Sequence, residues 1–195
     1  MLAYVFWHRA APGVQAGEYE QALEHFHRSL AHSPPAGLLE SATLRAADLP
    51  WLPGDGPGYE DWYLVESWSA LGVLETAAVS RGHEGAHREA ARRVGAGAAA
   101  VYRLIEGELR PGRARLAAWV SRAAGHGDPT VGQLLGDGVE AGEGSLWQRS
   151  LVLGPAPEFC LLHGAAELPA ETGLEAARLP AGWSVKLAGR EPLAL

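Results

Sequence analysis

Apolar and polar positions alternate with a two-residue period at the start of the chain. From Leu2 to Arg9 successive side chains fall on opposite faces, which is typical of a β-strand. The period then changes, and Tyr19, Leu23, Phe26 and Leu30 recur at helical spacing. Prolines at 34–35 stop this pattern. The sequence therefore predicts a strand followed by an amphipathic helix.

The same alternation of periods continues to the end of the chain. Proline and glycine dominate residues 50–58, which predicts a loop. Ser69 is a suitable N-cap for the helix that follows the third strand. We expect further strands at 38–45, 60–68, 98–106, 116–122, 146–153, 159–163 and 183–188, and further helices at 69–79, 84–94, 131–135 and 168–179.

Two segments of the first half have echoes in the second half. Residues 7–13 resemble residues 119–125, and residues 59–66 resemble residues 156–163. Such self-similarity predicts a duplicated supersecondary unit. The boundary falls at Arg110-Pro111-Gly112, so we expect one repeat over 1–110 and a second, shorter repeat over 111–195.

The order of elements gives each half a βαββαβ plan. This is the ferredoxin-like unit, whose helices cover one face of the sheet and leave the other face bare. The bare face has to be buried. We therefore predict an α+β fold in which two ferredoxin-like βαββαβ repeats pack sheet to sheet as a single-chain α+β barrel that encloses a space.

This plan resembles the dimeric α+β-barrel superfamily, in the form with both halves fused in one chain. The opening residues 4–9 and the strand at 59–63 are also similar to an uncharacterised family of bacterial proteins. The superfamily includes cofactor-free monooxygenases, stress-response barrel proteins and haem enzymes. The monooxygenases use an asparagine together with tryptophans, and this chain has no asparagine, so that mechanism does not carry over. We find no haem motif.

Charge and composition exclude several classes of partner. The net charge of -7 and the pI near 5.6 argue against nucleic acid and against an anionic membrane surface. The single cysteine, Cys160, excludes an internal disulfide and a cysteine-based zinc site. The N-terminus has no signal-peptide pattern, and we expect a cytoplasmic protein. The single lysine and the absent asparagine fit a heat-adapted host or a high G+C coding bias equally well.

Residues 83–87 match the HExxH pattern of zinc-dependent hydrolases. On a helix, His83 and His87 would bind zinc, and Glu84 would be the general base. Gly85 weakens a helix at this point, so we favour a solvent-facing helix start and keep zinc as the alternative. We also expect the histidines of the first helix to be solvated, except that His27 lies closer to the apolar stripe. No cofactor is clearly implied, and zinc and haem stay alternatives.

Strand parity selects the candidate ligand-binding residues. Aromatic and charged side chains share particular faces of the predicted strands, and buried charge has to be paired or serve a ligand. The alternative is structural: aromatic side chains in the core, a satisfied strand-end histidine, and arginines paired with nearby carboxylates. Cys160 is expected to be an inert buried thiol. The candidates are His8, Arg45, Trp62, Glu66, Arg149 and His163.

The sequence is compatible with three functions. The first is binding of a small, partly apolar molecule between the two sheets, with acid–base or oxidative chemistry in which His8 or His163 moves protons and Arg45 or Arg149 holds an anion. The second is a non-catalytic protein with a filled barrel and a homodimeric surface. The third is metal- or haem-dependent catalysis. Whether the protein is an enzyme stays open, and we expect a monomer or a homodimer.

Overall fold

The computed structural model describes residues 1–47, 49–80, 82–122, 125–135, 142–152, 157–167 and 183–194. Within these ranges the strands are β1 (Leu2–Ala10), β2 (Leu38–Ala46), β3 (Gly58–Val65), β4 (Val94–Gly107), β5 (Leu116–Ser121), β6 (Gly144–Val152), β7 (Phe159–His163) and β8 (Ser184–Pro192). The helices are α1 (Ala16–His32), α2 (Trp68–Ala78), α3 (Glu84–Ala91), α4 (Val131–Leu135) and the single 3-10 turn η1 (Pro111–Arg113). The helix expected at 168–179 lies outside the described residues.

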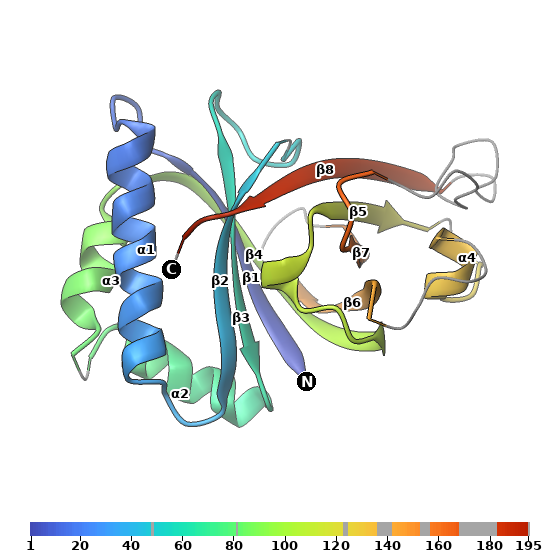
Figure 1. Cartoon of the computed structure of the whole chain (residues 1–195), viewed down its shortest axis with the longest axis horizontal. Helices are drawn as coiled ribbons and strands as arrows, with labels where there is room; N and C mark the ends of the chain where they lie inside the picture. Colours follow the sequence, from blue (N-terminus) through green and yellow to red (C-terminus); the bar gives the residue numbers. More distant parts are fainter. Residues whose placement is uncertain are drawn as a thin grey trace.

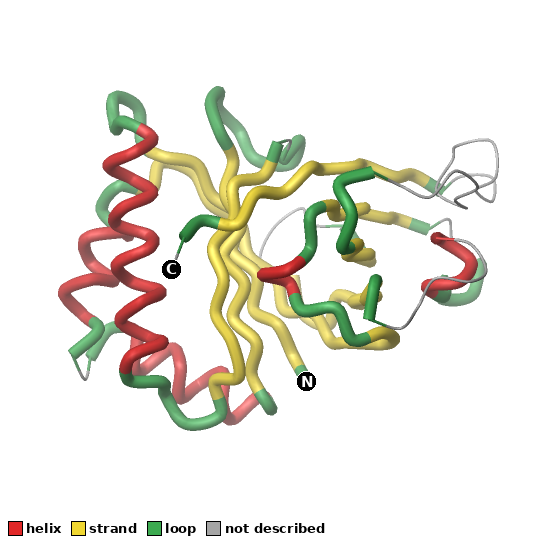
Figure 2. The backbone as a smooth tube through the Cα atoms, in the orientation of Figure 1, coloured by secondary structure: helices red, strands yellow, loops and turns green. Residues whose placement is uncertain are grey.

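The eight strands form one closed antiparallel barrel in the order β1-β3-β2-β8-β5-β7-β6-β4 (Figures 1 and 2). Two seams join the first four strands to the last four. At one seam β4 pairs with β6 from Ala100 to Gly107, and at the other β2 pairs with β8 over Leu44, Arg45 and Ala46. The β2–β8 seam is the shorter of the two, because it pairs only three residues of each strand.

This architecture corrects the predicted fold class. The prediction of an α+β fold with two ferredoxin-like repeats packed sheet to sheet is wrong, because the two sets of strands are hydrogen-bonded to each other into a single, mostly β barrel. The resemblance to the dimeric α+β-barrel superfamily and the internal duplication are corrected with it. The boundary proposed at Arg110 lies between β4 and η1 and stays a prediction.

Helices α1, α2 and α3 gather on one side of the barrel, against the outer faces of β1 to β4, whereas α4 lies at the far end beside the second set of strands (Figure 1). Helix α1 buries its predicted apolar stripe there: Tyr19, Leu23, Phe26 and Leu30 are all inaccessible or nearly so. The amphipathic helix predicted from the sequence is thus confirmed. None of the helices in the described ranges has the length and apolar character to cross a membrane.

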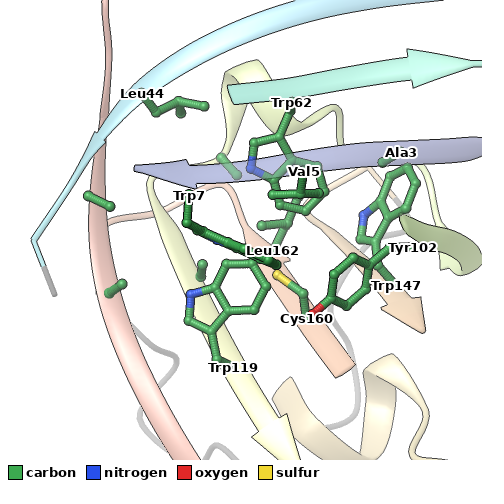
Figure 3. Close-up of a cluster of buried hydrophobic side chains, with 14 of the residues drawn as sticks. Ala3, Val5, Trp7, Leu44, Trp62, Tyr102, Trp119, Trp147, Cys160 and Leu162 are labelled. Atoms are coloured by element: carbon green, nitrogen blue, oxygen red, sulfur yellow. The ribbon is translucent and has the colours of Figure 1, made fainter. Parts of the chain in front are cut away.

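The barrel interior is a packed core and not an open space. The strands alternate, so that Trp7, Trp62, Trp119 and Trp147 point inward and surround Cys160 (Figure 3). The rings of Trp7 and Trp119 meet edge to face with centroids 5.2 Å apart. The other described members of this cluster are mostly small or aliphatic, including Ala3, Val5, Leu44, Leu64, Ala100, Ala117 and Leu162.

One fully buried ion pair lies in this interior. The Arg190 guanidinium of β8 donates through Nε to Glu60 Oε2 of β3 at 2.9 Å, and both side chains are inaccessible to solvent. Trp62 Nε1 donates to the same carboxylate oxygen at 3.0 Å, and the guanidinium stacks over the Trp62 ring. Burial, helped by the charge of Glu60, raises the pKa of the Cys160 thiol well above its usual value. Cys160 is therefore an inert buried thiol.

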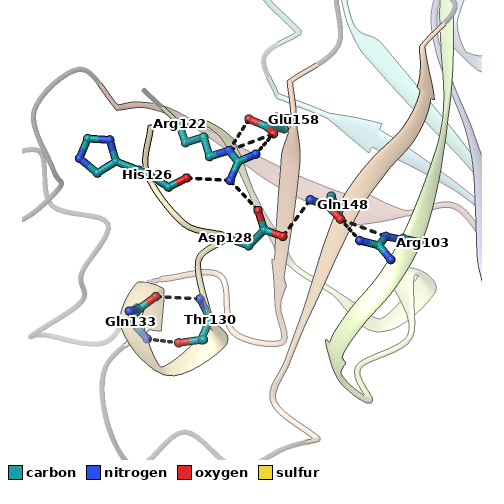
Figure 4. Close-up of polar contacts among 8 residues, drawn as sticks. All are labelled: Arg103, Arg122, His126, Asp128, Thr130, Gln133, Gln148 and Glu158. Carbon is teal, nitrogen blue, oxygen red and sulfur yellow. Dashed lines mark hydrogen bonds and ion pairs between the residues drawn. The ribbon is translucent and has the colours of Figure 1, made fainter. Parts of the chain in front are cut away.

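Ion pairs and hydrogen bonds between polar side chains hold a loop in the second half of the barrel against the strands (Figure 4). Arg122 pairs with Glu158 at 3.0 Å and with Asp128 at 2.6 Å. Asp128 accepts a hydrogen bond from Gln148, which in turn accepts one from Arg103. This series of side-chain contacts links the loop after β5 to β6 and β4.

Candidate functional site

A cavity of about 660 Å³ lies between the helices α1–α3 and the outer face of the barrel. Most of its lining is apolar. The residues that line it are Tyr4, Phe6, Tyr19, Leu23, Phe26, Asp61, Tyr63, Leu71, Leu74, Glu75, Ala78, Val79, His87, Ala90, Ala91, Val94, Val101 and Leu151.

Aromatic side chains form two walls of the cavity. Tyr4 and Phe6 of β1 and Tyr63 of β3 come from the barrel, and Phe26 comes from α1. The Tyr4 and Tyr63 rings are 6.0 Å apart, and Phe26 is 6.4 Å from Tyr63. Aromatic walls of this kind favour a flat, apolar ligand.

A buried carboxylate with two imidazoles marks one side of the cavity. Asp61 is 3% exposed and lies on the outer face of β3. Its Oδ2 is 3.2 Å from His8 Nε2, and its Oδ1 is 3.3 Å from His27 Nε2. Tyr63 donates its hydroxyl to Oδ2 at 3.2 Å. Both imidazoles are fully buried, so this is a compact ionic cluster shielded from solvent.

A second tyrosine extends the cluster. The Tyr19 hydroxyl is 2.6 Å from His8 Nδ1, on the side of the ring opposite to Asp61. The Tyr19 hydroxyl and His8 Nδ1 share this hydrogen bond, and the other ring nitrogen of His8 faces the carboxylate. Tyr19, His8 and Asp61 therefore lie in a line, with the imidazole between the hydroxyl and the carboxylate.

Burial and neighbouring charges determine whether Asp61, Tyr19 and Tyr63 are ionised at neutral pH. Burial raises the pKa of Asp61, but the charges of His8 and His27 outweigh burial and hold this pKa well below its usual range. Burial and the Asp61 charge raise the pKa of Tyr19 and of Tyr63. Asp61 is therefore an anion, and both hydroxyls keep their protons.

Strand pairing and helix periodicity bring these residues together. Phe6 of β1 lies opposite Asp61 of β3, so His8, two residues on, shares the outer face with Asp61. In α1, Tyr19 and His27 are eight residues apart and lie on the same face. That face is the one pressed against the barrel.

The structure distributes the predicted ligand-binding residues over several places. His8 belongs to the Asp61 cluster, whereas Trp62 lies on the opposite side of the wall, inside the barrel. Arg45 pairs with Glu20 and Glu191 on the surface, and Glu66 is exposed at the end of β3.

The second half holds the other predicted residues. His163 is buried on β7, and its Nδ1 lies 3.0 Å from the backbone oxygen of Glu143. Arg149 is half-buried on β6. Neither lines the cavity, so the structure brings neither to the Asp61 cluster.

The two histidines of the HExxH segment also separate. His83 precedes α3, and its Nδ1 contacts the Ser29 hydroxyl at 2.7 Å. His87 lines the cavity, where burial lowers its pKa and favours the neutral ring, which lies 5.2 Å from the Phe26 ring. The described residues contain no cluster of three or more histidine, cysteine, aspartate or glutamate side chains arranged to hold a metal ion.

Sequence reasoning missed most of the Asp61 cluster. Asp61 was not among the candidate residues, Tyr19 was assigned to the apolar stripe of the first helix, and His27 was expected close to that stripe. A usable signal was present: Glu60 and Asp61 stand side by side in a strand of otherwise apolar and aromatic residues. Two adjacent carboxylates in such a strand face opposite sides, so each needs its own buried partner.

Comparison with known proteins supports the barrel fold. No family model and no curated protein matches the chain. A solved structure titled "Crystal structure study of anthrone oxidase-like protein" is similar, with a TM-score of 0.54 and 9% sequence identity over 97% of this chain and 91% of that chain. At this identity the likeness concerns the fold alone.

Proposed function

We propose that this protein binds a small, largely apolar, aromatic molecule in the cavity between helices α1–α3 and the barrel wall. The observation that carries the proposal is the position of the Asp61 cluster at the wall of a mostly apolar cavity. Ligand sites combine such an apolar lining with a few placed polar groups.

The size of the cavity supports the proposal. A volume of about 660 Å³ lies within the range of roughly 300–1,000 Å³ that is usual for small-molecule sites. The sequence had placed the ligand between two sheets, in the interior of the fold, and the packed tryptophans inside the barrel argue against that position. The proposed site is therefore on the outer face of the wall, beneath the helices.

A fluorescence or calorimetric titration with 2-naphthol tests the proposal. Anthrone, a planar aromatic ketone, is a second probe, because the similar solved structure carries that compound in its title. Binding to the folded state alone also raises thermal stability in proportion to the logarithm of ligand concentration. We expect saturable binding of 2-naphthol with one site per chain.

A matched pair of variants on α2 locates that binding. Ala78 lines the cavity, so Ala78→Phe fills it and weakens 2-naphthol binding by about tenfold or more. Val73 is exposed on the same helix and does not line the cavity, so Val73→Phe leaves the affinity unchanged. Equal affinities in the two variants, or no saturable binding of either probe, contradict the proposal.

A further inference from the structure

Tyr4 lies in the middle of the barrel wall that faces the cavity. On β1 it pairs with Tyr63 of β3 on one side and with Val101 of β4 on the other, and both of these partners also line the cavity. Helices α1–α3 gather over this face (Figure 1), yet Tyr4 is only partly buried. A molecule held in the cavity can therefore touch the Tyr4 side chain.

The Tyr4 hydroxyl has no hydrogen-bond partner in the described part of the chain, and it is not sealed from solvent. The other two tyrosines of the lining use their hydroxyls within the Asp61 cluster. Tyr63 donates to Asp61, and Tyr19 shares a hydrogen bond with His8. A largely buried tyrosine hydroxyl usually has a partner. Of these three hydroxyls, that of Tyr4 is the one that remains available to a ligand.

Burial and charge keep the Tyr4 hydroxyl protonated at neutral pH. Burial raises the pKa of Tyr4, and the charge of Asp61 raises this pKa further. A phenolic hydroxyl can donate or accept a hydrogen bond. It is the better donor, because the lone pairs of its oxygen are partly delocalised into the ring. The complementary group on a ligand is therefore a hydrogen-bond acceptor.

Two other polar side chains of the lining, Glu75 and His87, also make no hydrogen bond within the described ranges. Glu75 is exposed on α2, where water solvates its carboxylate. The neutral ring of His87 is two rings away from Tyr4, since His87 contacts Phe26 at 5.2 Å, Phe26 contacts Tyr63 at 6.4 Å, and Tyr63 contacts Tyr4 at 6.0 Å between centroids. A neutral imidazole has one donor and one acceptor nitrogen, so His87 favours neither class of ligand.

We propose that the Tyr4 hydroxyl donates a hydrogen bond to a carbonyl oxygen of the bound molecule, so that the cavity recognises aromatic ketones. The aromatic body of the ketone lies against Phe6, Phe26 and Tyr63, and its carbonyl oxygen points towards β1. This inference rests on the proposed function, since it assigns a chemical class to the molecule held in the same cavity.

Two probes of the same shape measure this hydrogen bond in a calorimetric or fluorescence titration. They are 2-acetonaphthone, which carries a carbonyl oxygen, and 2-isopropenylnaphthalene, which carries a methylene group in its place. Both are uncharged, but they differ in their transfer from water, so the quantity compared is the change in the affinity of each probe on substitution. Tyr4→Phe removes the hydroxyl alone. We expect it to weaken 2-acetonaphthone binding by about fivefold to tenfold and to change 2-isopropenylnaphthalene binding by less than about twofold.

Tyr102→Phe is the matched control. Tyr102 lies inside the barrel, where its hydroxyl donates to the backbone oxygen of Pro157 at 2.6 Å, and it does not line the cavity. This substitution also removes one tyrosine hydroxyl, and we expect it to leave the affinities for both probes unchanged.

An infrared measurement tests the hydrogen bond in the unmodified protein, so it does not depend on the folding of a variant. A hydrogen bond to a carbonyl oxygen lowers the C=O stretching frequency. We expect the stretch of bound 2-acetonaphthone, labelled with carbon-13 at the carbonyl, to lie below its value in hexane. A stretch at the hexane value overturns the inference.

The outcomes distinguish the two proposals. If neither probe binds to the unmodified protein, the proposed function fails. If both probes bind and Tyr4→Phe changes their affinities equally, the cavity is a ligand site but Tyr4 does not recognise a carbonyl group, and the inference is overturned. The Tyr4 hydroxyl has no partner within the described part of the chain, so we expect Tyr4→Phe to unfold at the same temperature as the unmodified protein.

Discussion

Neighbouring residues in this protein have different roles because strand parity sends them to opposite sides of the barrel wall. Trp7 points into the packed interior, and His8 points outward to Asp61 and the helices. The same division separates Glu60, which pairs with Arg190 inside, from Asp61, which pairs with two histidines outside. A single residue of slippage in β1 or β3 would exchange these partners.

In acidic solution, Asp61 makes the free energy of unfolding depend on pH. Its pKa in the folded state lies below the value of about 3.9 expected for an unfolded chain. The unfolded chain therefore takes up the proton first, so the stabilisation is complete above about pH 4 and is lost as the pH falls towards the folded pKa. From this group we expect a loss of up to about 1.4 kcal/mol per pH unit below about pH 4.

Urea unfolding of the unmodified protein and of Asp61→Asn, measured between about pH 5 and pH 2, isolates this contribution. The difference in the free energy of unfolding between the two proteins should shrink as the pH falls. Asp55→Asn, at an exposed position, should follow the unmodified protein over the same range. A difference for Asp61→Asn that is independent of pH would refute the interpretation.

At the scale of elements, the sequence pattern located the helices and strands well, but their ends depended on contacts. The strand predicted at 98–106 begins earlier, at Val94, because small residues let the backbone pass close to its neighbours. A Cβ on Gly97 would lie 2.6 Å from the Phe6 ring, and one on Gly95 would lie 2.7 Å from the backbone of Ala11. The sequence instead predicted a helix up to residue 94, since glycines such as those that follow are also typical of helix ends.

The first residue of α2 also differs from the prediction. The predicted N-cap was Ser69, whereas the structure begins α2 at Trp68 and uses Ser67 as the cap. The Ser67 hydroxyl accepts a hydrogen bond from the backbone nitrogen of Ala70 at 3.2 Å. Both serines fit the cap pattern, and the end of β3 at Val65 decides between them.

This cap supports a helix that forms one wall of the cavity. Replacing Ser67 by alanine is expected to lower the free energy of unfolding by about 1 kcal/mol, measured by urea unfolding. Ser80, beyond the other end of α2, donates its hydroxyl to an exposed carbonyl of the helix, so Ser80→Ala is the control and should change stability by less than about 0.5 kcal/mol. Equal effects at the two positions would argue against a capping role for Ser67.

At the scale of the whole molecule, the closing seam between β2 and β8 decides the architecture. The sequence predicted the last strand at 183–188, but β8 continues to Pro192, and its final three residues are the ones that pair with β2. The sequence pattern did not predict this extension, because Gly189 and Pro192 both weaken a strand pattern. Without these pairs the sequence pattern predicts two separate sheets. The structure shows that the strands form one closed barrel instead.

The Glu60–Arg190 pair crosses the same seam from inside the barrel, since it joins β3 to β8. Glu60→Gln leaves a buried guanidinium without its counterion, and we expect a loss of about 3–5 kcal/mol in the free energy of unfolding. The exposed pair of Arg45 and Glu191 joins β2 to β8 on the outside. Glu191→Gln is the control, with an expected loss of no more than about 1 kcal/mol in the same denaturant titration. Similar losses in the two variants would show that the buried pair does not hold the seam.

By itself, the sequence determined the periodicity of each element, the burial of the α1 stripe and the inert character of Cys160, because these follow from local spacing and residue type. It also drew attention to His8. The closed barrel, the inward direction of Trp62 and the meeting of Asp61 with His8 and His27 were decided by tertiary structure. Each of these depends on strand register and on contacts between segments far apart in the chain, and alternation along one strand cannot tell which of its two faces turns inward.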